Sequence, residues 1–320
     1  MNQLLSVVIP VYNEGEGIAH AIQQISKTLV QANIPHEFVL VDDGSRDHSW
    51  DELLKLAKGS DNILSVKLSR NFGKEAALCA GLDHAKGACC LCMDSDLQHP
   101  PEIIPEMYRL WKDDGVEVVE GIKKHRGRES ISYKLSAKIF YQLLKKTSGI
   151  NLENASDFRL LDRVAVEAWK SLPERSTFFR GMSTWIGFSR AQVSFVVAPR
   201  ENGSTKWSFF RLARLGLSAI TSFSAAPLYL SATIGCAFLF LFVLLLGWTL
   251  YMKFMGIAAD GFTTVISLQL IVGGLLLLSV GVIGIYLEKI YEEVKGRPRY
   301  LIHRVVARNP TSSNSIVREG

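Results

Sequence analysis

Two carboxylates, Asp94 and Asp96, end an apolar stretch in the segment LCMDSDLQHPPE at residues 91–102. They are two positions apart, so on an extended chain they point to the same side. Two like charges on one side attract a cation, and oxygen ligands favour Mg²⁺ or Mn²⁺ over zinc or copper. Acidic pairs are common on surfaces, but this one follows a stretch too apolar for a surface strand, and two prolines then stop regular pairing. The pattern therefore predicts a metal site that binds a diphosphate.

A second acidic turn, DDGS at residues 42–45, ends another apolar stretch in the same way. One interpretation is that Ser45 or Asp47 caps the helix that follows. A single cap does not need three carboxylates, so we predict that Asp42 or Asp43 binds a polar heterocycle or a ribose. A nucleotide-sugar would use both acidic turns. Neither usual phosphate loop is present, because NEGEGIAH lacks the third glycine of the dinucleotide motif and no G-x-x-x-x-G-K-[ST] occurs.

Alternating strands and helices are expected to position these side chains over the first 205 residues. Apolar, β-branched stretches predict strands at residues 4–12, 37–45, 62–70 and 87–96. Helical spacing predicts helices at residues 17–31 and 74–86. This order predicts an α/β fold with a mostly parallel sheet covered on both faces. Ligands of such sheets gather at the carboxyl ends of the strands, where both acidic turns fall.

The composition excludes disordered and fibrous classes, since 21% of the 320 residues are charged and 48% are hydrophobic. Three of the five cysteines, Cys89, Cys90 and Cys92, lie in the apolar stretch before the first acidic pair. Their C-x-x-C spacing has no second pair and no well-spaced histidines, so buried, reduced thiols are predicted in place of a zinc site. Such thiols suit a reducing compartment. The N-terminal stretch lacks a basic leader and is broken at Pro10, which predicts a first strand and no signal peptide.

Two long stretches, residues 215–252 and 261–287, contain no Asp, Glu, Lys or Arg. Each exceeds the roughly 20 apolar residues that cross a bilayer, so two membrane spans are predicted. The alternative, two buried helices of a soluble core, is disfavoured by this length and purity. Basic residues flank the pair on both outer sides, which places both termini in the cytoplasm and the short loop outside.

The resulting domain plan has four parts. Residues 1–205 are expected to form a cytoplasmic domain that carries both acidic turns, and residues 206–226 are expected to form a juxtamembrane amphipathic helix with an aromatic face beside a basic one. An ordinary packed helix is the alternative for the second part. Residues 227–288 form a two-helix transmembrane hairpin, and residues 289–320 form a cytoplasmic basic tail.

Seven segments carry a family resemblance: VVIPVYNE, VDDGS, SRNFGKEAALCAGLDHA, DSDLQHPPE, DFRLLDR, LPERSTFFRG and EVKGRPRY. They resemble the family 2 glycosyltransferases that act on polyprenyl phosphates. The sequence is most similar to bactoprenol glucosyltransferases, with dolichol-phosphate mannose synthases and undecaprenyl-phosphate aminoarabinose transferases as relatives. The similarity runs in order from about residue 5 to 303 and includes both spans. It implies a GT-A fold and inverting sugar transfer from a nucleotide-sugar to a lipid phosphate at the cytoplasmic face of the inner membrane.

The resemblance also implies roles for individual residues. Donor-binding residues are expected at Pro10, Tyr12, Glu14, Asp42, Asp43, Lys74, Asp94, Ser95 and Asp96. Metal ligands, for Mg²⁺ or Mn²⁺, are expected at Asp94, Asp96 and Gln98. Candidates for binding the acceptor phosphate are Lys123, Lys134, Arg200 and Lys206. The segment GIKKHRGR departs from the family, where relatives often carry arginine early, because lysine keeps the charge but loses the two-pronged contact.

Asp157 matches the catalytic carboxylate of the family, with a loop or helix-cap aspartate as the alternative. A phosphate monoester has a second pKa of about 6, so most of the acceptor is a dianion at pH 7 and has little proton to surrender. A carboxylate with a pKa of about 4 matches that proton poorly. We therefore expect Asp157 to orient a basic side chain or the sugar.

Two other classes of function fit the sequence less well. A processive polysaccharide synthase would carry a Q-x-x-R-W motif, but the chain has no Arg-Trp pair. A scaffold or transport subunit without catalysis is disfavoured, since both spans lack charged residues. The resemblance favours UDP-glucose, with GDP-mannose, UDP-N-acetylhexosamine and UDP-aminoarabinose as alternatives. Expected partners are the donor, the polyprenyl phosphate, the membrane and a separate flippase for the lipid-linked sugar, with no nucleic acid. Self-association is expected through glycine faces at Gly273, Gly274, Gly281 and Gly284.

Overall fold

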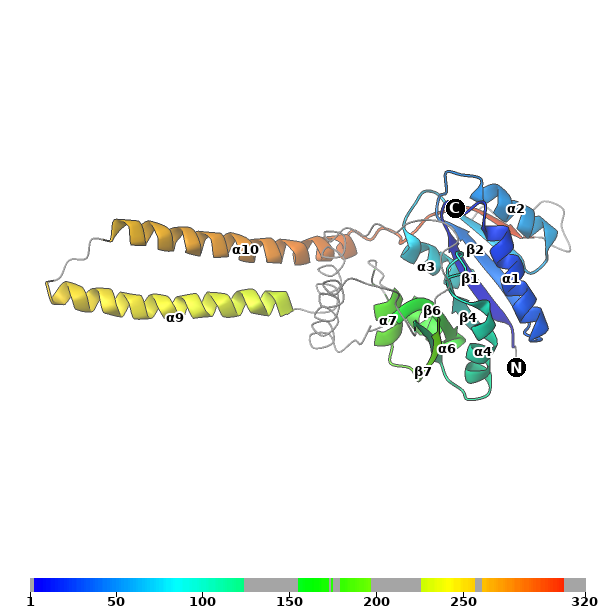
Figure 1. Ribbon diagram of the computed structural model, residues 1–320. Coiled ribbons are helices and arrows are strands. Elements are labelled where there is room, and N and C mark those ends of the chain that lie inside the picture. Colours follow the sequence, from blue (N-terminus) through cyan, green and yellow to red (C-terminus); the bar gives the residue numbers. More distant parts are fainter. Residues whose placement is uncertain are drawn as a thin grey trace. The chain divides into compact units, whose positions relative to one another are not determined.

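The structure, a computed structural model, describes residues 3–123, 155–172, 174, 179–196, 226–256 and 261–307. The chain divides into two compact units. One is a sheet domain that also includes the chain from Pro298 onward, and the other contains the two long helices α9 and α10 (Figure 1).

An eight-stranded sheet forms the centre of the first unit, counted over the described residues, in the order β7-β5-β6-β4-β1-β2-β3-β8. Its strands are β1 (Leu5–Val11), β2 (His36–Asp42), β3 (Ile63–Leu68), β4 (Cys89–Cys92), β5 (Val118–Lys123), β6 (Ala155–Asp162), β7 (Arg190–Phe195) and β8 (Ile302–Ala307). The four neighbours β4, β1, β2 and β3 run parallel, which confirms the prediction of a mostly parallel sheet. Strand β6 runs antiparallel to β4 and β5, and β8 runs antiparallel to β3.

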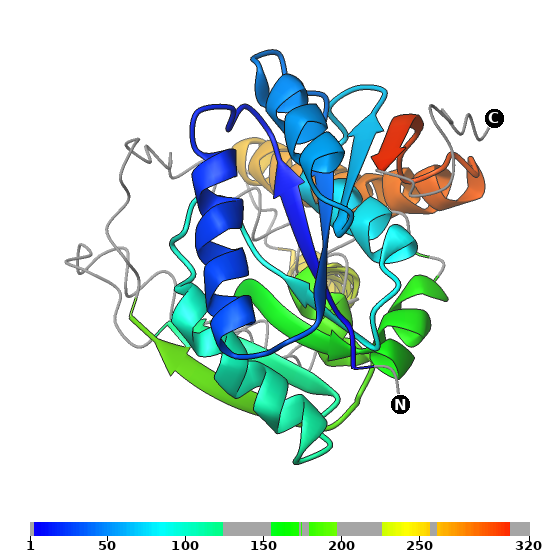
Figure 2. The same cartoon turned by 90° about the vertical axis from the view of Figure 1, so that its right-hand side faces the viewer.

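Helices cover both faces of this sheet (Figure 2). They are α1 (Ile18–Gln31), α2 (Ser49–Gly59), α3 (Lys74–His84), the 3-10 turn η1 (Pro101–Ile103), α4 (Ile104–Lys112), α6 (Arg163–Lys170) and α7 (Phe179–Trp185). Successive residues of a strand point to opposite faces. Accordingly, Val7 and Ile9 of β1 belong to the core that Ile25 of α1 joins, whereas Val8 lies against Gly81 of α3 on the other face. A Cβ at Gly81 would collide with Val8, so glycine allows α3 to approach the sheet closely.

The predicted buried thiols are confirmed in β4. Cys89, Cys90 and Cys92 are buried and free of disulfides. Burial raises the pKa of the Cys90 thiol to about 12, so it stays protonated at neutral pH. These side chains serve as small hydrophobic residues at the centre of the parallel strands.

The segment after the second long helix differs from the expected tail. Helix α10 continues to Val294, and Ile302–Ala307 forms the edge strand β8 beside β3. The link between them is held to the sheet domain by two side chains. Arg299 donates a hydrogen bond to the carbonyl of Leu172, and the Tyr300 hydroxyl donates to Asp83 Oδ2 at 2.5 Å. The pairing covers the otherwise open edge of β3.

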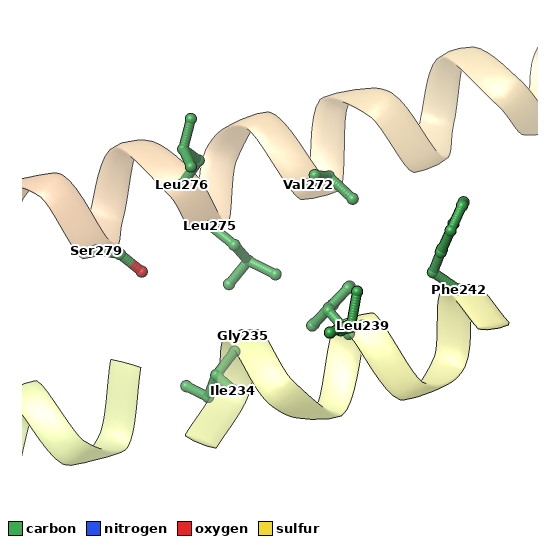
Figure 3. A pocket seen from close by; sticks show the side chains of 9 residues that line it. Ile234, Gly235, Leu239, Phe242, Val272, Leu275, Leu276 and Ser279 are labelled. Atoms are coloured by element: carbon green, nitrogen blue, oxygen red, sulfur yellow. The ribbon is translucent and has the colours of Figure 1, made fainter. Parts of the chain in front are cut away.

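The second unit contains the helices α9 (Ala226–Phe254) and α10 (Phe262–Val294). Their apolar stretches, Pro227–Met252 and Ile271–Val294, have mean hydropathies of 2.4 and 2.1 and are long enough to cross a membrane. Neither stretch is buried within the structure, as it would be in a soluble core. Apolar side chains of both helices, with Leu239 and Leu275 among them, line a pocket of about 350 Å³ (Figure 3). Apart from its last residue, the predicted amphipathic helix at 206–226 lies outside the described residues.

Candidate active site

A cavity of about 280 Å³ lies at the carboxyl ends of β1, β2 and β4 and the beginning of α3. It is lined by Pro10, Val11, Tyr12, Glu14, Asp43, Asn71, Gly73, Lys74, Asp94, Ser95 and Asp96. The structure thus brings together all the residues predicted to bind the donor except Asp42. The parallel strands explain this, because their carboxyl ends meet at one edge of the sheet.

The turns after β1 and β2 are joined by hydrogen bonds. The Asn13 backbone N–H donates to Ser45 Oγ at 3.0 Å, and the Arg46 N–H donates to Asn13 Oδ1 at 2.9 Å. The Glu14 N–H donates to Ser49 Oγ at 2.9 Å. Hydroxyl and amide side chains of two turns therefore satisfy each other's backbone and fix the wall of the cavity.

The neighbouring carboxylates Asp42 and Asp43 have different surroundings. Asp43 lines the cavity, and its two oxygens accept backbone N–H groups that follow β3, at 2.7 and 2.9 Å. Asp42 is fully buried, and its Oδ1 accepts the Ser45 N–H at 3.0 Å. Gly44 has φ +68°, and a Cβ there would lie 2.5 Å from the carbonyl carbon of Arg70. Of the two carboxylates that the sequence left open, Asp43 is the one at the cavity, whereas Asp42 shapes its turn.

Lys74 connects the turn after β4 with strand β6. Its Nζ lies 2.6 Å from Asp94 Oδ1 and 2.6 Å from Asp157 Oδ2. Burial alone would lower the pKa of Lys74, but the two carboxylates outweigh burial and raise it. Lys74 is the first residue of α3, after Gly73 at φ +99°. The lysine is therefore a fully charged ammonium shared by two aspartates.

Asp157 lies within strand β6, in neither a loop nor a helix cap, and 8% of its side chain is exposed. Arg180 of α7 donates from Nε to Oδ1 at 2.5 Å and from Nη2 to Oδ2 at 2.9 Å. Burial would raise the pKa of Asp157, but Arg180 and Lys74 lower it well below its usual range. The carboxylate is thus ionised at neutral pH and balanced by two cations.

A buried arginine, Arg159, stabilises the pair formed by Asp157 and Arg180. Only 1% of the Arg159 side chain is exposed, and it forms an ion pair with Glu120 at 3.4 Å. Its guanidinium donates to the carbonyl oxygen of Ser156 at 3.2 Å and to that of Arg180 at 3.1 Å. Arg159 therefore ties the backbone beside Asp157 to the backbone that carries Arg180.

A further carboxylate, Glu75, lies next to Lys74 on α3. Its Oε2 accepts the Phe179 N–H at 2.8 Å, at the beginning of α7. Burial, followed by the charge of Asp157, raises the pKa of Glu75 to about 7. Glu75 therefore titrates near neutral pH beside the ionised Asp157.

Sequence reasoning missed Arg180, Arg159 and Glu75 as parts of this site. All three lie inside the segments that carry the family resemblance, LPERSTFFRG, DFRLLDR and GKEAAL. That membership was the available signal. Their partners come from other segments of the chain, so spacing alone gives no means of pairing them.

The chemistry of the turn after β4 fits a hard divalent cation. Asp94 is 32% exposed and Asp96 is exposed, and the Gln98 backbone N–H donates to Asp96 Oδ1 at 3.1 Å. The buried His99 stacks on Phe158 with ring centroids 4.9 Å apart, beneath this turn. Within the described part of the chain, no three His, Cys, Asp or Glu side chains form a metal cluster. Two carboxylates suit Mg²⁺ or Mn²⁺, which complete their shells with water and substrate phosphates.

The predicted acceptor-binding residues are not brought to the cavity by the described part of the structure. Lys123 is the last residue of β5, and its side chain is not described. Lys134, Arg200 and Lys206 lie outside the described residues.

Comparisons with known proteins agree with this arrangement. Residues 6–169 match the sequence model of glycosyl transferase family 2. An uncharacterized glycosyltransferase of Synechocystis sp. is 37% identical over 93% of this chain and 94% of its own length. A prophage bactoprenol glucosyl transferase homolog of Escherichia coli is 35% identical over 94% of this chain and 99% of its own length.

A solved structure of similar fold is glucosyl-3-phosphoglycerate synthase from Mycobacterium tuberculosis, in complex with Mn²⁺, UDP and phosphoglyceric acid. It is 22% identical, with a TM-score of 0.50 over 68% of this chain and 76% of that chain. At this identity the likeness shows the fold, and the predicted GT-A fold of the sheet domain is confirmed.

Proposed function

This chain belongs to glycosyl transferase family 2, and we propose that it transfers a sugar from a nucleotide-sugar to a polyprenyl phosphate, with UDP-glucose as the first candidate donor. The observation that carries the proposal is the meeting of Asp94, Asp96 and Lys74 in one cavity at the strand ends. The name of the bactoprenol glucosyl transferase relative supports the lipid acceptor.

We assign the donor to the cavity. The nucleoside end is assigned to Pro10, Tyr12, Glu14 and Asp43, with Asp42 shaping the turn and Lys74 and Ser95 nearer the diphosphate. Asp94, Asp96 and Gln98 are assigned to the metal and the diphosphate. When bound, Mg²⁺ or Mn²⁺ stabilises the charge that develops on the departing nucleoside diphosphate.

In the proposed reaction, an oxygen of the acceptor phosphate attacks the anomeric carbon of the sugar. A new carbon–oxygen bond forms as the bond to the diphosphate breaks, and the electron pair leaves on the nucleoside diphosphate, with inversion at carbon. The acceptor is mostly a dianion at pH 7 and needs no base. Asp157 is assigned to holding Arg180 and Lys74 beside the reacting groups. Lys123, Lys134, Arg200 and Lys206 remain the proposed contacts of the acceptor phosphate.

The proposed location is the cell inner membrane, with the sheet domain and both termini in the cytoplasm. The length and hydropathy of α9 and α10 support two crossings, and residues 206–226 are proposed to lie in the interface. Basic residues, including Arg214 before α9 and Arg297 after α10, support this orientation.

Cysteine labelling tests the orientation. In a Cys236→Ser background, Ala259→Cys should react with a membrane-impermeant thiol reagent in spheroplasts. The buried cysteines of β4 should not react in that preparation. Reaction of Ala259→Cys only in inverted vesicles would contradict the topology.

Two protein partners complete the proposal. Glycines along α10, Gly273 and Gly281 among them, favour association of two or more copies in the membrane. A separate flippase would carry the lipid-linked sugar to the other leaflet of the membrane, because a polar sugar crosses the apolar bilayer core poorly by itself. Chemical cross-linking of detergent-free membranes tests the first of these, and a monomer alone would contradict it.

A transfer assay tests the function. The purified full-length chain is incubated with Mg²⁺, polyprenyl phosphate and a panel of radiolabelled nucleotide-sugars, and lipid is then extracted. We expect label in the lipid fraction from UDP-glucose, lost on chelation of the metal. Lipid label from GDP-mannose, a UDP-N-acetylhexosamine or UDP-aminoarabinose alone would change the sugar. A polymeric product would indicate a processive synthase, and no product with any donor would support a scaffold or transport subunit.

A further inference from the structure

The ammonium of Lys74 already occupies the carboxylate that is proposed to bind the metal. Its Nζ is 2.6 Å from Asp94 Oδ1, as close as a hydrogen-bonded ion pair allows. The same nitrogen is 2.6 Å from Asp157 Oδ2, so Lys74 retains one partner if it leaves the other. About a third of the Lys74 side chain, 38%, is exposed, so ligands can reach it.

A divalent cation and this ammonium are in conflict at Asp94. Repulsion between a double and a single positive charge at about 4 Å is large compared with thermal energy at the dielectric constants of protein surfaces. Lysine has a flexible four-carbon stem and three rotatable donors, so its ammonium can change partners with little movement of the backbone. Metal binding at Asp94 therefore requires Lys74 to move.

We propose that Lys74 is an exchangeable counter-ion, which holds Asp94 until a divalent cation and the donor diphosphate arrive and then transfers its contact to that diphosphate. This inference rests on the proposed donor and metal sites. Lys74 lines the cavity beside Ser95 and Asp96, within reach of a ligand there. Asp157 keeps its two bonds from Arg180 throughout, so it remains ionised and keeps hold of the Lys74 side chain.

The exchange couples the metal to the nucleotide. A metal that binds without nucleotide displaces Lys74 from Asp94 and offers the ammonium no new anion. A metal that binds with the nucleotide brings phosphate oxygens that accept the ammonium. Each ligand therefore strengthens the binding of the other by the same factor. Without the lysine charge, the metal alone should bind more tightly and the coupling should shrink.

Electron paramagnetic resonance of free Mn²⁺ measures this directly. The full-length protein in detergent is titrated with Mn²⁺, with and without saturating UDP. We expect Lys74→Met to bind Mn²⁺ alone at least about tenfold more tightly than the wild type, about 1.4 kcal/mol. We also expect UDP to improve Mn²⁺ affinity less in Lys74→Met than in the wild type. Lys74→Gln provides a second neutral variant with the same expected direction, should the methionine variant fold poorly.

Lys170→Met is the matched control. Lys170 is also partly exposed and paired with an aspartate, Asp83, and it lies outside the cavity lining. Its loss should leave Mn²⁺ binding unchanged, which excludes a general effect of net charge. Unchanged or weaker Mn²⁺ binding in both Lys74 variants, with wild-type binding of Mn²⁺ and UDP intact, would overturn the exchange and leave the proposed function standing. A wild type that binds neither Mn²⁺ nor UDP would overturn both.

Discussion

Asp94 lies in the turn after β4, and Asp157 lies within the neighbouring strand β6. Both contact the ammonium of Lys74. Asp157 is 8% exposed and also receives two hydrogen bonds from Arg180, so two protein cations balance one carboxylate. Asp94 is 32% exposed, and a second carboxylate, Asp96, follows two positions later. Aspartate thus serves two tasks here. The protein's own cations neutralise Asp157, whereas the pair Asp94 and Asp96 is suited to a metal.

The largest expected effect on sugar transfer comes from substitutions of the carboxylate pair, Asp94 and Asp96. Asp94→Asn and Asp96→Asn should each lower sugar transfer by at least about a hundredfold, because each removes a charged ligand of the metal and diphosphate. Thermal unfolding of the purified variants should match the wild type, since both side chains are accessible to solvent. The exposed Asp114→Asn serves as control and should retain full transfer. Near-normal activity with unchanged metal dependence in either cavity variant would remove the metal assignment.

A smaller effect is expected when the guanidinium beside Asp157 is replaced by an ammonium. Arg180→Lys keeps the charge but loses the two-pronged contact, which should lower kcat about tenfold to a hundredfold through misplacement of Asp157 and Lys74. The KM for the nucleotide-sugar should change little. Steady-state kinetics distinguishes the outcomes, because a raised KM with unchanged kcat would show that Arg180 binds the donor.

The third prediction concerns stability near Asp157. The pKa of Glu75 is raised in the folded protein from 4.5 to about 7, so the folded state holds this proton more firmly than the unfolded state. Its contribution is therefore complete below pH 4.5 and is lost as the pH rises through about 7. The loss amounts to about 3 kcal/mol, because a change of one unit in pKa corresponds to about 1.4 kcal/mol.

Glu75→Gln should remove this dependence, because glutamine still accepts the Phe179 N–H but carries no titrating proton. The Tm of wild type and variant is measured in detergent from pH 4.5 to 8. The wild type should lose Tm relative to the variant as the pH rises. A difference in Tm that stays constant across this range would show that Glu75 does not titrate there.

The smallest effect is expected at a carboxylate outside the cavity. Asp83 accepts the Tyr300 hydroxyl at 2.5 Å on an exposed surface, so Tyr300→Phe should cost less than about 1 kcal/mol. Transfer should be unchanged. Urea denaturation and the transfer assay together check this, and lost activity would mean that the link before β8 bears on the site.

The four parallel strands β1 to β4 could be predicted from the sequence, whereas the other four strands, β5 to β8, could not. Strands β1 to β4 are apolar stretches separated by helices, and these local patterns place Asp43, Asp94 and Asp96 at strand ends. Strand β8 pairs with β3 only after the chain has passed through two long helices. Nothing in the local pattern of residues 302–307 specifies that edge.

The residues of the site likewise divide into those that the sequence predicts and those that it does not. Asp94 and Asp96 are predicted from the local sequence, because two positions on an extended chain define a side and the pair lies between an apolar stretch and two prolines. Arg180 is 23 positions from Asp157, and the Phe179 N–H that Glu75 accepts is 104 positions away. Such contacts depend on how β6, α3 and α7 pack, which spacing does not encode. The expectation that Asp157 orients a basic side chain came from phosphate chemistry and stays a prediction until it is measured.

The central claim is that Asp157 positions cations and that the acceptor dianion reacts without a base. The most direct test is the pH dependence of kcat/KM for wild type and Asp157→Asn, measured with a water-soluble short-chain polyprenyl phosphate. Asp157→Asn should lower kcat/KM about a hundredfold, yet keep an acidic limb at about pH 6, the second pKa of the phosphate. The same limb in Glu75→Gln would exclude Glu75 as its source. Loss of the limb in Asp157→Asn would contradict the account, because Asp157 would then be the titrating base.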